Sequence, residues 1–141
     1  DLDARIPPAV TDAGAPHLVL ALRDRARLAA LAYDFEAGRA LALRETICTF
    51  NVLHAEDVGR FHARNPFPYG GVYEDPATGA AAAALGGYLR HLRWPHGGAI
   101  EVVQGEDMGQ PSLLRVGIGA DPSAGLLVSG QVRWLREATA P

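Results

Sequence analysis

The spacing of hydrophobic and polar positions changes along the chain, and the longest apolar stretch lies in its middle. From Thr78 to Leu89, only Thr78 and Tyr88 carry a polar side-chain atom. A helix that is apolar on every side has no face for solvent, so other elements must enclose it. The pattern therefore predicts a buried central helix from Thr78 to about Leu92, with residues 81–85 almost inaccessible.

The start of this helix carries local signals of its own. Asp75 is a residue type that often caps a helix N-terminus, and Pro76 has the backbone angle that suits a first turn. The first N–H groups of a helix have no intrahelical partner. Thr78, Gly79 and Ala80 are therefore candidates for binding an anion such as a carboxylate or a phosphate. The same features also fit a purely structural cap.

Shorter elements surround the central one. Periodicity near 3.6 residues predicts two short helices within Arg23 to Leu43, and Pro and Gly signals mark residues 1–15 as a loop or linker. Short alternating or apolar runs predict strands at Pro16–Leu22, Thr46–Leu53, Gly59–Arg64, Ala99–Gln104, Leu113–Ile118, Gly125–Ser129 and Gln131–Leu135. Short turns between the last four imply antiparallel neighbours. We expect an α/β (α+β) fold in which a curled, mainly antiparallel sheet wraps around the central helix.

Composition and charge fit one globular domain. The 141 residues are 48% hydrophobic and 21% charged, and the formal net charge is −3. The basic residues are scattered, which gives no electrostatic footprint for nucleic acid. Apart from histidine they are all arginine. Without lysine the chain cannot supply the Schiff-base amine that pyridoxal phosphate enzymes use, so racemisation or epimerisation would require direct proton transfer.

The side chains that most often carry catalysis or metals give few further candidates. A single cysteine excludes an intrachain disulfide, and the alternating segment around Cys48 predicts a buried core thiol. A catalytic thiol is the less favoured alternative, because no neighbour in the sequence would lower the pKa of the thiol. The histidines lack metal-ligand spacing, so we expect no metal site. His17 either lines a cleft or is a satisfied structural histidine.

Two further expectations concern surfaces. His62 and Arg64 share one face of a predicted strand; an exposed face is the expected arrangement, and a role beside the anion site is the alternative. No stretch is long and apolar enough to span a membrane, and no signal peptide is visible. We therefore expect a cytoplasmic protein without a membrane partner.

Three stretches carry motifs in a fixed order. Residues 12–20 read DAGAPHLVL, residues 74–79 read EDPATG and residues 103–114 read VQGEDMGQPSLL. Together they resemble the phenazine-biosynthesis PhzC/PhzF-like family of cofactor-independent isomerases and epimerases, and EDPATG is the most specific of the three. The resemblance implies that residues 1–141 form the C-terminal lobe, with 1–15 as a linker, of a diaminopimelate-epimerase-like fold. That fold has two such lobes with a cleft between them.

The resemblance also implies a chemistry. Asp75 would act as a general acid/base or an orienting carboxylate, and Glu74, Thr78, Gly79 and Ala80 would bind a small carboxylate substrate. Neither a cofactor nor a metal is implied. The expected partners are this substrate, an N-terminal lobe and, as an open alternative, a second copy of the chain in a homodimer.

The chain departs from the family pattern in several places. Ala80 stands where serine is usual, Gln110 where arginine is common, and residues 12–14 where Ser-Thr-Gly is frequent. The family's first lobe, with its catalytic Glu and a Gly-His motif, has no counterpart here, and Asp1 in place of Met suggests part of a longer gene product. We expect the isolated chain to be inactive without that lobe in cis or in trans. The alternative is a non-catalytic binding or assembly module that keeps the anion site.

Overall fold

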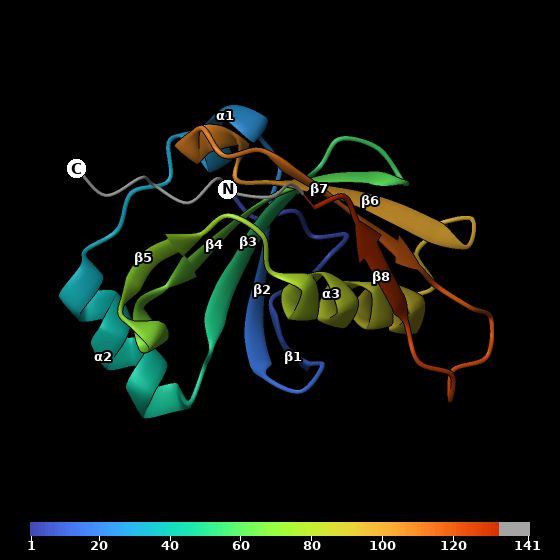
Figure 1. The fold of residues 1–141 in the computed structure, drawn as a ribbon, viewed down its shortest axis with the longest axis horizontal. Coiled ribbons are helices and arrows are strands. Elements are labelled where there is room, and N and C mark those ends of the chain that lie inside the picture. Colours follow the sequence, from blue (N-terminus) through green and yellow to red (C-terminus); the bar gives the residue numbers. More distant parts are fainter. Residues whose placement is uncertain (133–141) are drawn as a thin grey trace, which may run out of the picture.

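The computed structural model describes residues 1–132 and shows a curved sheet of eight strands around one long helix (Figure 1). The strands are β1 (Ala9–Asp12), β2 (Pro16–Leu22), β3 (Thr49–Ala55), β4 (Arg60–Phe67), β5 (Val72–Asp75), β6 (Ala99–Gln104), β7 (Ser112–Gly117) and β8 (Leu127–Gly130). The helices are α1 (Arg25–Ala29), α2 (Phe35–Glu45) and α3 (Gly79–His91), with short 3-10 turns η1 (Pro68–Gly70) and η2 (Glu106–Met108). The predicted central helix inside a curled sheet is confirmed.

The sheet is mainly antiparallel, as the sequence predicts. Its order is β1-β2-β3-β4-β6-β7-β8, and β5 pairs with β4 outside this path. Only two of the described pairings are parallel, β2 with β3 and β4 with β6. Parallel neighbours need a crossover connection, and helices supply both: α1 and α2 link β2 to β3, and α3 lies between β4 and β6.

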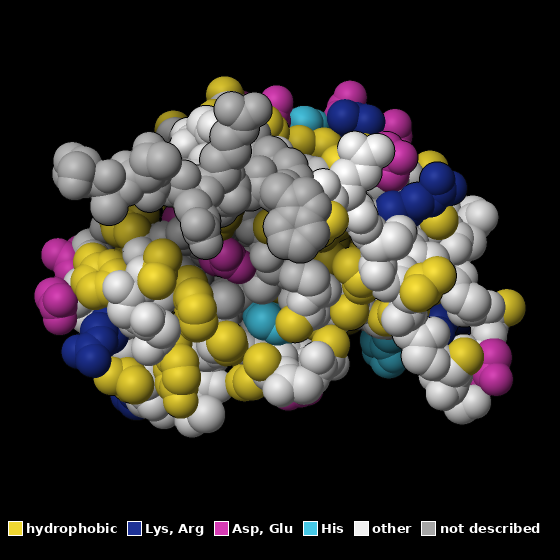
Figure 2. Space-filling model, in the orientation of Figure 1, with side chains coloured by type: hydrophobic (Ala, Val, Ile, Leu, Met, Phe, Trp, Pro, Cys, Tyr) yellow, Lys and Arg dark blue, Asp and Glu magenta, His cyan; other side chains and the backbone are white. Residues whose placement is uncertain are grey.

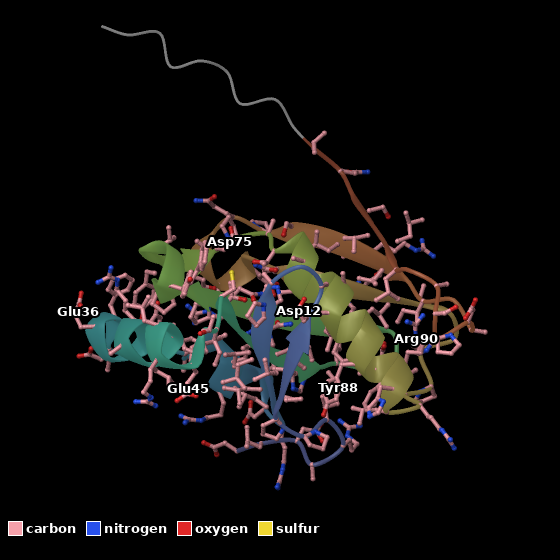
Figure 3. The ribbon with its side chains drawn as sticks, turned by 90° about the horizontal axis from the view of Figure 1, so that it is seen from below. Asp12, Glu36, Glu45, Asp75, Tyr88 and Arg90 are labelled. Carbon is pink, nitrogen blue, oxygen red and sulfur yellow. The ribbon has the colours of Figure 1, made fainter. Side chains whose placement is uncertain are left out.

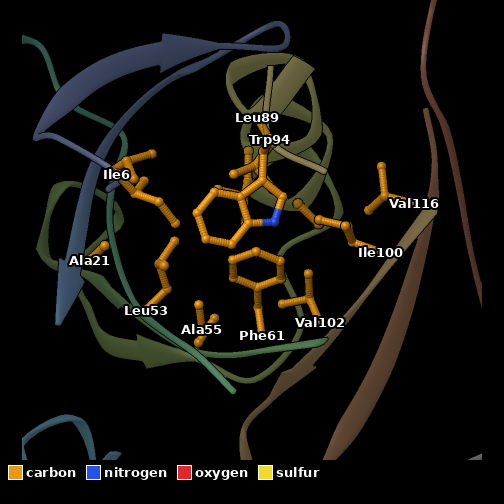
Figure 4. Packing of buried hydrophobic residues seen from close by; sticks show 14 of the residues in the cluster. Ile6, Ala21, Leu53, Ala55, Phe61, Leu89, Trp94, Ile100, Val102 and Val116 are labelled. Atoms are coloured by element: carbon orange, nitrogen blue, oxygen red, sulfur yellow. The ribbon is translucent and has the colours of Figure 1, made fainter. Parts of the chain in front are cut away.

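The main core lies between α3 and the concave face of the sheet. Phe61 of β4, Leu85 of α3 and Val102 of β6 are all buried there. Trp94 packs among these side chains next to Phe61 (Figure 4). The Trp94 indole packs against Phe61 with ring centroids 5.9 Å apart and donates its N–H to the carbonyl oxygen of Val58 at 2.8 Å. This bond satisfies the one polar atom of a large side chain that would otherwise be buried unpaired.

A second, smaller core covers the convex face. Leu28 of α1 and Ala42 of α2 pack there against Phe50 and Val52 of β3. β3 is therefore buried on both faces, which a half-solvated strand would not be. Cys48 precedes this strand and is only half-buried, so the prediction of a fully buried core thiol is wrong; the strand begins one residue after it.

Helix α3 is enclosed along most, but not all, of its surface. Leu85 is fully buried, and Gly86 packs so closely that an added Cβ would lie 2.8 Å from Val116 Cγ1. Ala83 and Gly87, however, line a gap between the end of β1 and the loop before β8. The expectation that this whole segment is inaccessible is wrong for Ala83, because the sheet stays open between its first and last strands.

The first fifteen residues are more than the loop that the sequence predicts. β1 forms an antiparallel hairpin with β2, and Ile6 is fully buried in the main core. The Pro and Gly signals mark the turns on both sides of β1 correctly, but a strand of only four residues gives too little alternation to be recognised. The last predicted strand, Gln131–Leu135, lies largely outside the described residues, and 131–132 are not in a strand.

Candidate functional site

The candidate site forms where strand β4 changes its partner. Ala63 pairs with Gln104 at the end of β6, and two residues later Asn65 pairs with Asp75 at the end of β5. The ends of β5 and β6 thus lie along the same edge of β4. Because α3 begins shortly after β5, Asp75 lies beside the start of this helix, whereas Arg90 lies near its other end (Figure 3).

Asp75, Thr78 and Gln104 form one hydrogen-bonded unit. The Thr78 hydroxyl donates to Asp75 Oδ2 at 2.6 Å. Gln104 Nε2 donates to the Asp75 carbonyl oxygen at 2.7 Å and to Thr78 Oγ1 at 2.9 Å, and its Oε1 accepts from the Thr78 backbone N–H at 3.1 Å. Asp75 and Thr78 are half-buried, and Gln104 is 1% exposed. The unit fixes the carboxylate relative to the helix N-terminus.

Asp75 does not cap α3 in the way that the sequence predicts. Thr78 is the N-cap residue, and within residues 1–132 its side chain accepts no capping hydrogen bond from the helix. Asp75 is the last residue of a strand, three residues too early for an N-cap, so its carboxylate meets the Thr78 hydroxyl instead. The N–H groups at the start of α3 keep their capacity for an anion because no side chain of the helix cap occupies them.

The structure separates Glu74 from the other candidate residues. Strand alternation turns its side chain to the opposite face of β5, where it is 6% exposed. Both of its oxygens bind Arg64, at 3.0 Å from Nε and 2.6 Å from Nη2, and Arg64 Nη1 also donates to the carbonyls of Leu28, Ala29 and Leu31. The expected exposed His/Arg face is thus wrong for Arg64, because this ion pair buries it between α1 and β5.

The VQGEDMGQPSLL motif contacts the backbone of the EDPATG segment. Ser112 Oγ donates to the Pro76 carbonyl at 2.9 Å. Gly105 has a φ of +75°, and a Cβ there would overlap the Gln110 carbonyl and lie 2.8 Å from the Pro76 oxygen. Only glycine fits such a close backbone approach. The two motifs therefore meet in space, and the second holds the loop that carries Thr78.

A row of buried polar side chains crosses the concave face behind the site. His17 Nδ1 contacts Thr49 Oγ1 at 2.8 Å, and Thr49 Oγ1 donates to Asn65 Oδ1 at 3.0 Å. Asn65 is the register partner of Asp75. Burial lowers the pKa of His17, and the nearby charge of Asp12 opposes this shift. His17 is thus a buried histidine of the sheet that is hydrogen-bonded through Nδ1, but within residues 1–132 its Nε2 has no hydrogen-bond partner, so it is only in part the satisfied structural histidine that the sequence left open.

Cys48 lies near the same end of the sheet without the features of a nucleophile. Burial raises the pKa of its thiol, and the negative charge of Asp75 raises it further. A thiolate is therefore disfavoured there. Among the described residues no three His, Cys, Asp or Glu side chains converge on a metal-binding geometry, and no helix is long and apolar enough to cross a membrane.

The strand edge that leads to Asp75 carries exposed apolar side chains. Tyr69, Val72 and Tyr73 are 44%, 47% and 44% exposed, and apolar side chains gather over the α2 and β5 side of the molecule (Figure 2). Tyr73 stacks on Tyr33 at a centroid distance of 4.5 Å, and the Tyr33 hydroxyl donates to the Tyr73 carbonyl at 2.6 Å. Burial raises the pKa of Tyr33 to about 12. The contacts between Tyr33 and Tyr73 join β5 to the segment before α2.

Sequence reasoning did not predict the contacts that Gln104, Ser112 and Arg64 make around the site. The first two lie inside a quoted motif, but no rule of spacing links them to residues thirty positions earlier. One signal was available for Gln104: an amide at the end of an otherwise apolar strand must find partners if it is buried. Arg64 had no such signal, because its partner Glu74 lies on a strand that the sequence does not reveal.

The chain matches the family model "Phenazine biosynthesis-like protein" (PhzC-PhzF) over residues 1–136. It is 36% identical over 104 residues to trans-2,3-dihydro-3-hydroxyanthranilate isomerase of Pseudomonas aeruginosa, covering 70% of this chain and 34% of the relative. It is 34% identical over 112 residues to an uncharacterized isomerase of Mesorhizobium japonicum, covering 74% of this chain and 37% of that protein.

Solved structures show the same fold. A predicted epimerase of P. aeruginosa superposes with a TM-score of 0.66 at 26% identity, over 99% of this chain and 48% of the other. A PhzF-family protein of Bacillus anthracis gives 0.68 at 18% identity, over 91% and 46%. The fold is thus the diaminopimelate-epimerase-like fold of PhzF proteins. The chain belongs to the PhzC/PhzF family of isomerases, and it spans between about a third and a half of the length of these relatives.

Proposed function

We propose that this chain is the Asp75-bearing, C-terminal lobe of a cofactor-independent PhzF-like isomerase or epimerase. The observation that carries the proposal is the hydrogen-bonded unit at the start of α3. There the carboxylate of Asp75 is held by Thr78 next to the N–H groups of the helix. A proton shift at carbon needs an acid/base group beside a site that stabilises negative charge on the substrate, and this unit combines the two.

The proposed substrate is a small carboxylate. The N–H groups of Thr78, Gly79 and Ala80 would bind its anionic group, although Thr78 N–H already donates to Gln104 and leaves the other two as the available donors. The name of the P. aeruginosa relative specifies such a compound, trans-2,3-dihydro-3-hydroxyanthranilate, which is the first substrate to test. Glu74 contributes indirectly, because its buried pair with Arg64 holds β5 in place.

The second acid/base group would come from an N-terminal lobe, supplied in the same chain or in trans. Two observations support a missing surface. The chain spans 34% and 37% of two curated relatives, and the exposed side chains of Tyr69, Val72 and Tyr73 lie on β5, which ends at Asp75, and on the turn before it. Apolar side chains beside a polar site are typical of a surface that another domain covers. A cytoplasmic location and a homodimer remain predictions.

A non-catalytic binding or assembly module is the second candidate. Ala80 favours it, since the methyl group at the exposed start of α3 replaces the hydroxyl that is usual in the family. The described hydrogen bonds of Thr78 to Gln104 and Asp75 would also stabilise the loop before α3 in a protein that has no catalytic activity. Such a module would bind small carboxylates at α3 without exchanging a substrate proton for solvent.

The experiment that separates these functions uses the chain joined behind the N-terminal lobe of a family member, hereafter the two-lobed protein. We expect Asp75→Asn to lower turnover by about a hundredfold or more, because it removes the basic oxygen. The Asn side-chain oxygen still accepts the Thr78 hydroxyl, so the melting temperature should change little. Deuterium incorporation from solvent and thermal unfolding are measured on the same samples.

The matched control is Asp12→Asn, an exposed carboxylate at the end of β1 that should leave turnover unchanged. Full proton exchange by the Asp75→Asn variant would reduce Asp75 to a structural residue. In that case carboxylate binding without exchange would favour the binding module.

A further inference from the structure

The side chain of Gln104 can lie in only one orientation. The Thr78 backbone N–H is a donor, so the atom that faces it at 3.1 Å must be Oε1. The Asp75 carbonyl oxygen is an acceptor, so the atom that faces it at 2.7 Å must be Nε2. Backbone groups on both sides therefore determine the amide, which is 1% exposed and has no solvent alternative.

This orientation determines the direction of the next hydrogen bond. One N–H of Gln104 Nε2 is used on the Asp75 carbonyl, and the other points at Thr78 Oγ1 at 2.9 Å. Thr78 Oγ1 is thus an acceptor from Gln104. Its single hydroxyl hydrogen is left for Asp75 Oδ2 at 2.6 Å, which accepts when the carboxylate is ionised. The chain of bonds runs from Gln104 through Thr78 to one oxygen of Asp75.

We propose that Gln104 and Thr78 are positioning residues that reserve Asp75 Oδ2 as an acceptor and leave Oδ1 as the oxygen that takes up and releases the substrate proton. The hydrogen bond from the Thr78 hydroxyl is strongest when Oδ2 carries negative charge, so a proton placed on Oδ2 would weaken it. A proton placed on Oδ1 leaves Oδ2 free to accept this bond. In the reaction the C–H electron pair stays on the substrate carbon while the proton moves to Oδ1. The second acid/base group, from the N-terminal lobe, delivers a proton to the substrate to complete the shift, and Oδ1 releases its proton before the next turnover.

The catalytic part of this inference rests on the proposed function, but the direction of the bonds does not. The proposed positioning role also explains why the VQG motif contains Gln104, although Gln104 need not contact the substrate. Gln104 reaches the site from β6, so the end of one strand fixes the carboxylate at the end of another. Preorganisation of this kind lets one oxygen work without rotation of the carboxylate between turnovers.

The first test needs no turnover and uses the 141-residue chain itself. We expect the hydroxyl proton of Thr78 to give an NMR resonance that exchanges slowly with water and shows a cross-peak to Gln104 Nε2–H. Gln104→Glu keeps an oxygen for the Thr78 N–H but removes the donating amide, so exchange of the hydroxyl should speed up by about tenfold or more. Thr11, whose hydroxyl donates to the His17 carbonyl, is the control that should not change.

The second test uses the two-lobed protein. Thr78→Val removes the hydroxyl and should lower kcat about tenfold with KM nearly unchanged, whereas Thr78→Ser restores the hydroxyl and should stay within about threefold of the parent. Thr11→Val is the matched control. Equal turnover of the Val and Ser variants, or a Thr78 hydroxyl that exchanges as fast as free water allows, would overturn the inference. A two-lobed protein without any turnover would contradict the proposed function, while the hydroxyl exchange would still decide the direction of the bonds.

Discussion

At the scale of single residues, neighbours in the sequence have opposite roles. Asp75 faces the start of α3, while Glu74 is buried on the other face of β5 against Arg64. The family resemblance predicts both as site residues, and β5, with only four residues before Pro76, is too short for its alternation to separate them. A buried carboxylate needs a partner, and that partner, Arg64, lies ten positions away on a strand whose pairing the sequence does not reveal.

His17 gives a prediction for pH. Burial lowers its pKa in the native state below the ordinary value of 6.5, and Asp12 opposes this without reversing it. Below that value the unfolded chain takes up a proton that the native chain resists, so the stability present above pH 6.5 is progressively lost as pH falls. We expect His17→Gln to reduce the difference between the free energies of unfolding at about pH 7.5 and about pH 5.5.

Urea denaturation at the two pH values measures this difference. His91→Gln, at an exposed position near the end of α3, is the control and should keep the pH dependence of the parent chain. If His17→Gln keeps it too, other groups cause the pH dependence and the buried row behind Asp75 is not sensitive to protonation.

At the scale of elements, the sequence predicts the elements that have long apolar runs, but it does not predict the short strands that only backbone pairing defines. The composition of residues 78–89 predicts helix α3 and its burial; the helix is confirmed, and its burial is confirmed for most positions but not for Ala83. The short strands β1 and β5 are found only in the structure, because backbone pairing rather than pattern defines them. The contact between Gln104 and Asp75 follows from the change of partner along β4, which no spacing rule contains.

Two adjacent glycines of α3 test how the sheet encloses this helix. A Cβ on Gly86 would lie 2.8 Å from Val116 Cγ1, whereas one on Gly87 would meet only Leu126 Cδ1 at 3.5 Å. Alanine in a helix interior is favoured over glycine by about 0.8–1 kcal/mol. We expect Gly87→Ala to stabilise the chain by nearly this amount and Gly86→Ala to destabilise it, because Val116 is stiff and overpacking costs about 1–3 kcal/mol.

Chemical denaturation of the two variants checks this pair, and each serves as the control for the other, since helix propensity is the same at both positions. An equal gain in stability in both variants would mean that Val116 of β7 does not pack closely against α3 at Gly86. An equal loss would mean that the gap between β1 and β8 is closed in solution.

At the scale of the whole molecule, residues 1–132 form a fold of the PhzC/PhzF family with two cores, and one candidate acid/base group, Asp75, lies at the site that they form. The fold class and the family could be predicted from three motifs and one apolar helix. The site could be predicted only in part, since the motifs name Asp75 and Thr78 but not the amide that joins them. The exposed edge beside Asp75 is where we expect a second surface to complete the site.

The most direct test of the account is solvent deuterium incorporation into a small carboxylate substrate, measured for the 141-residue chain alone and for the two-lobed protein. The account predicts no incorporation above background by the chain alone, because a proton shift needs two acid/base groups and, within residues 1–132, Asp75 is the one candidate that we assign to the site. It predicts incorporation by the two-lobed protein. Exchange by the chain alone would contradict the account, since a second acid/base group would then lie within these 141 residues.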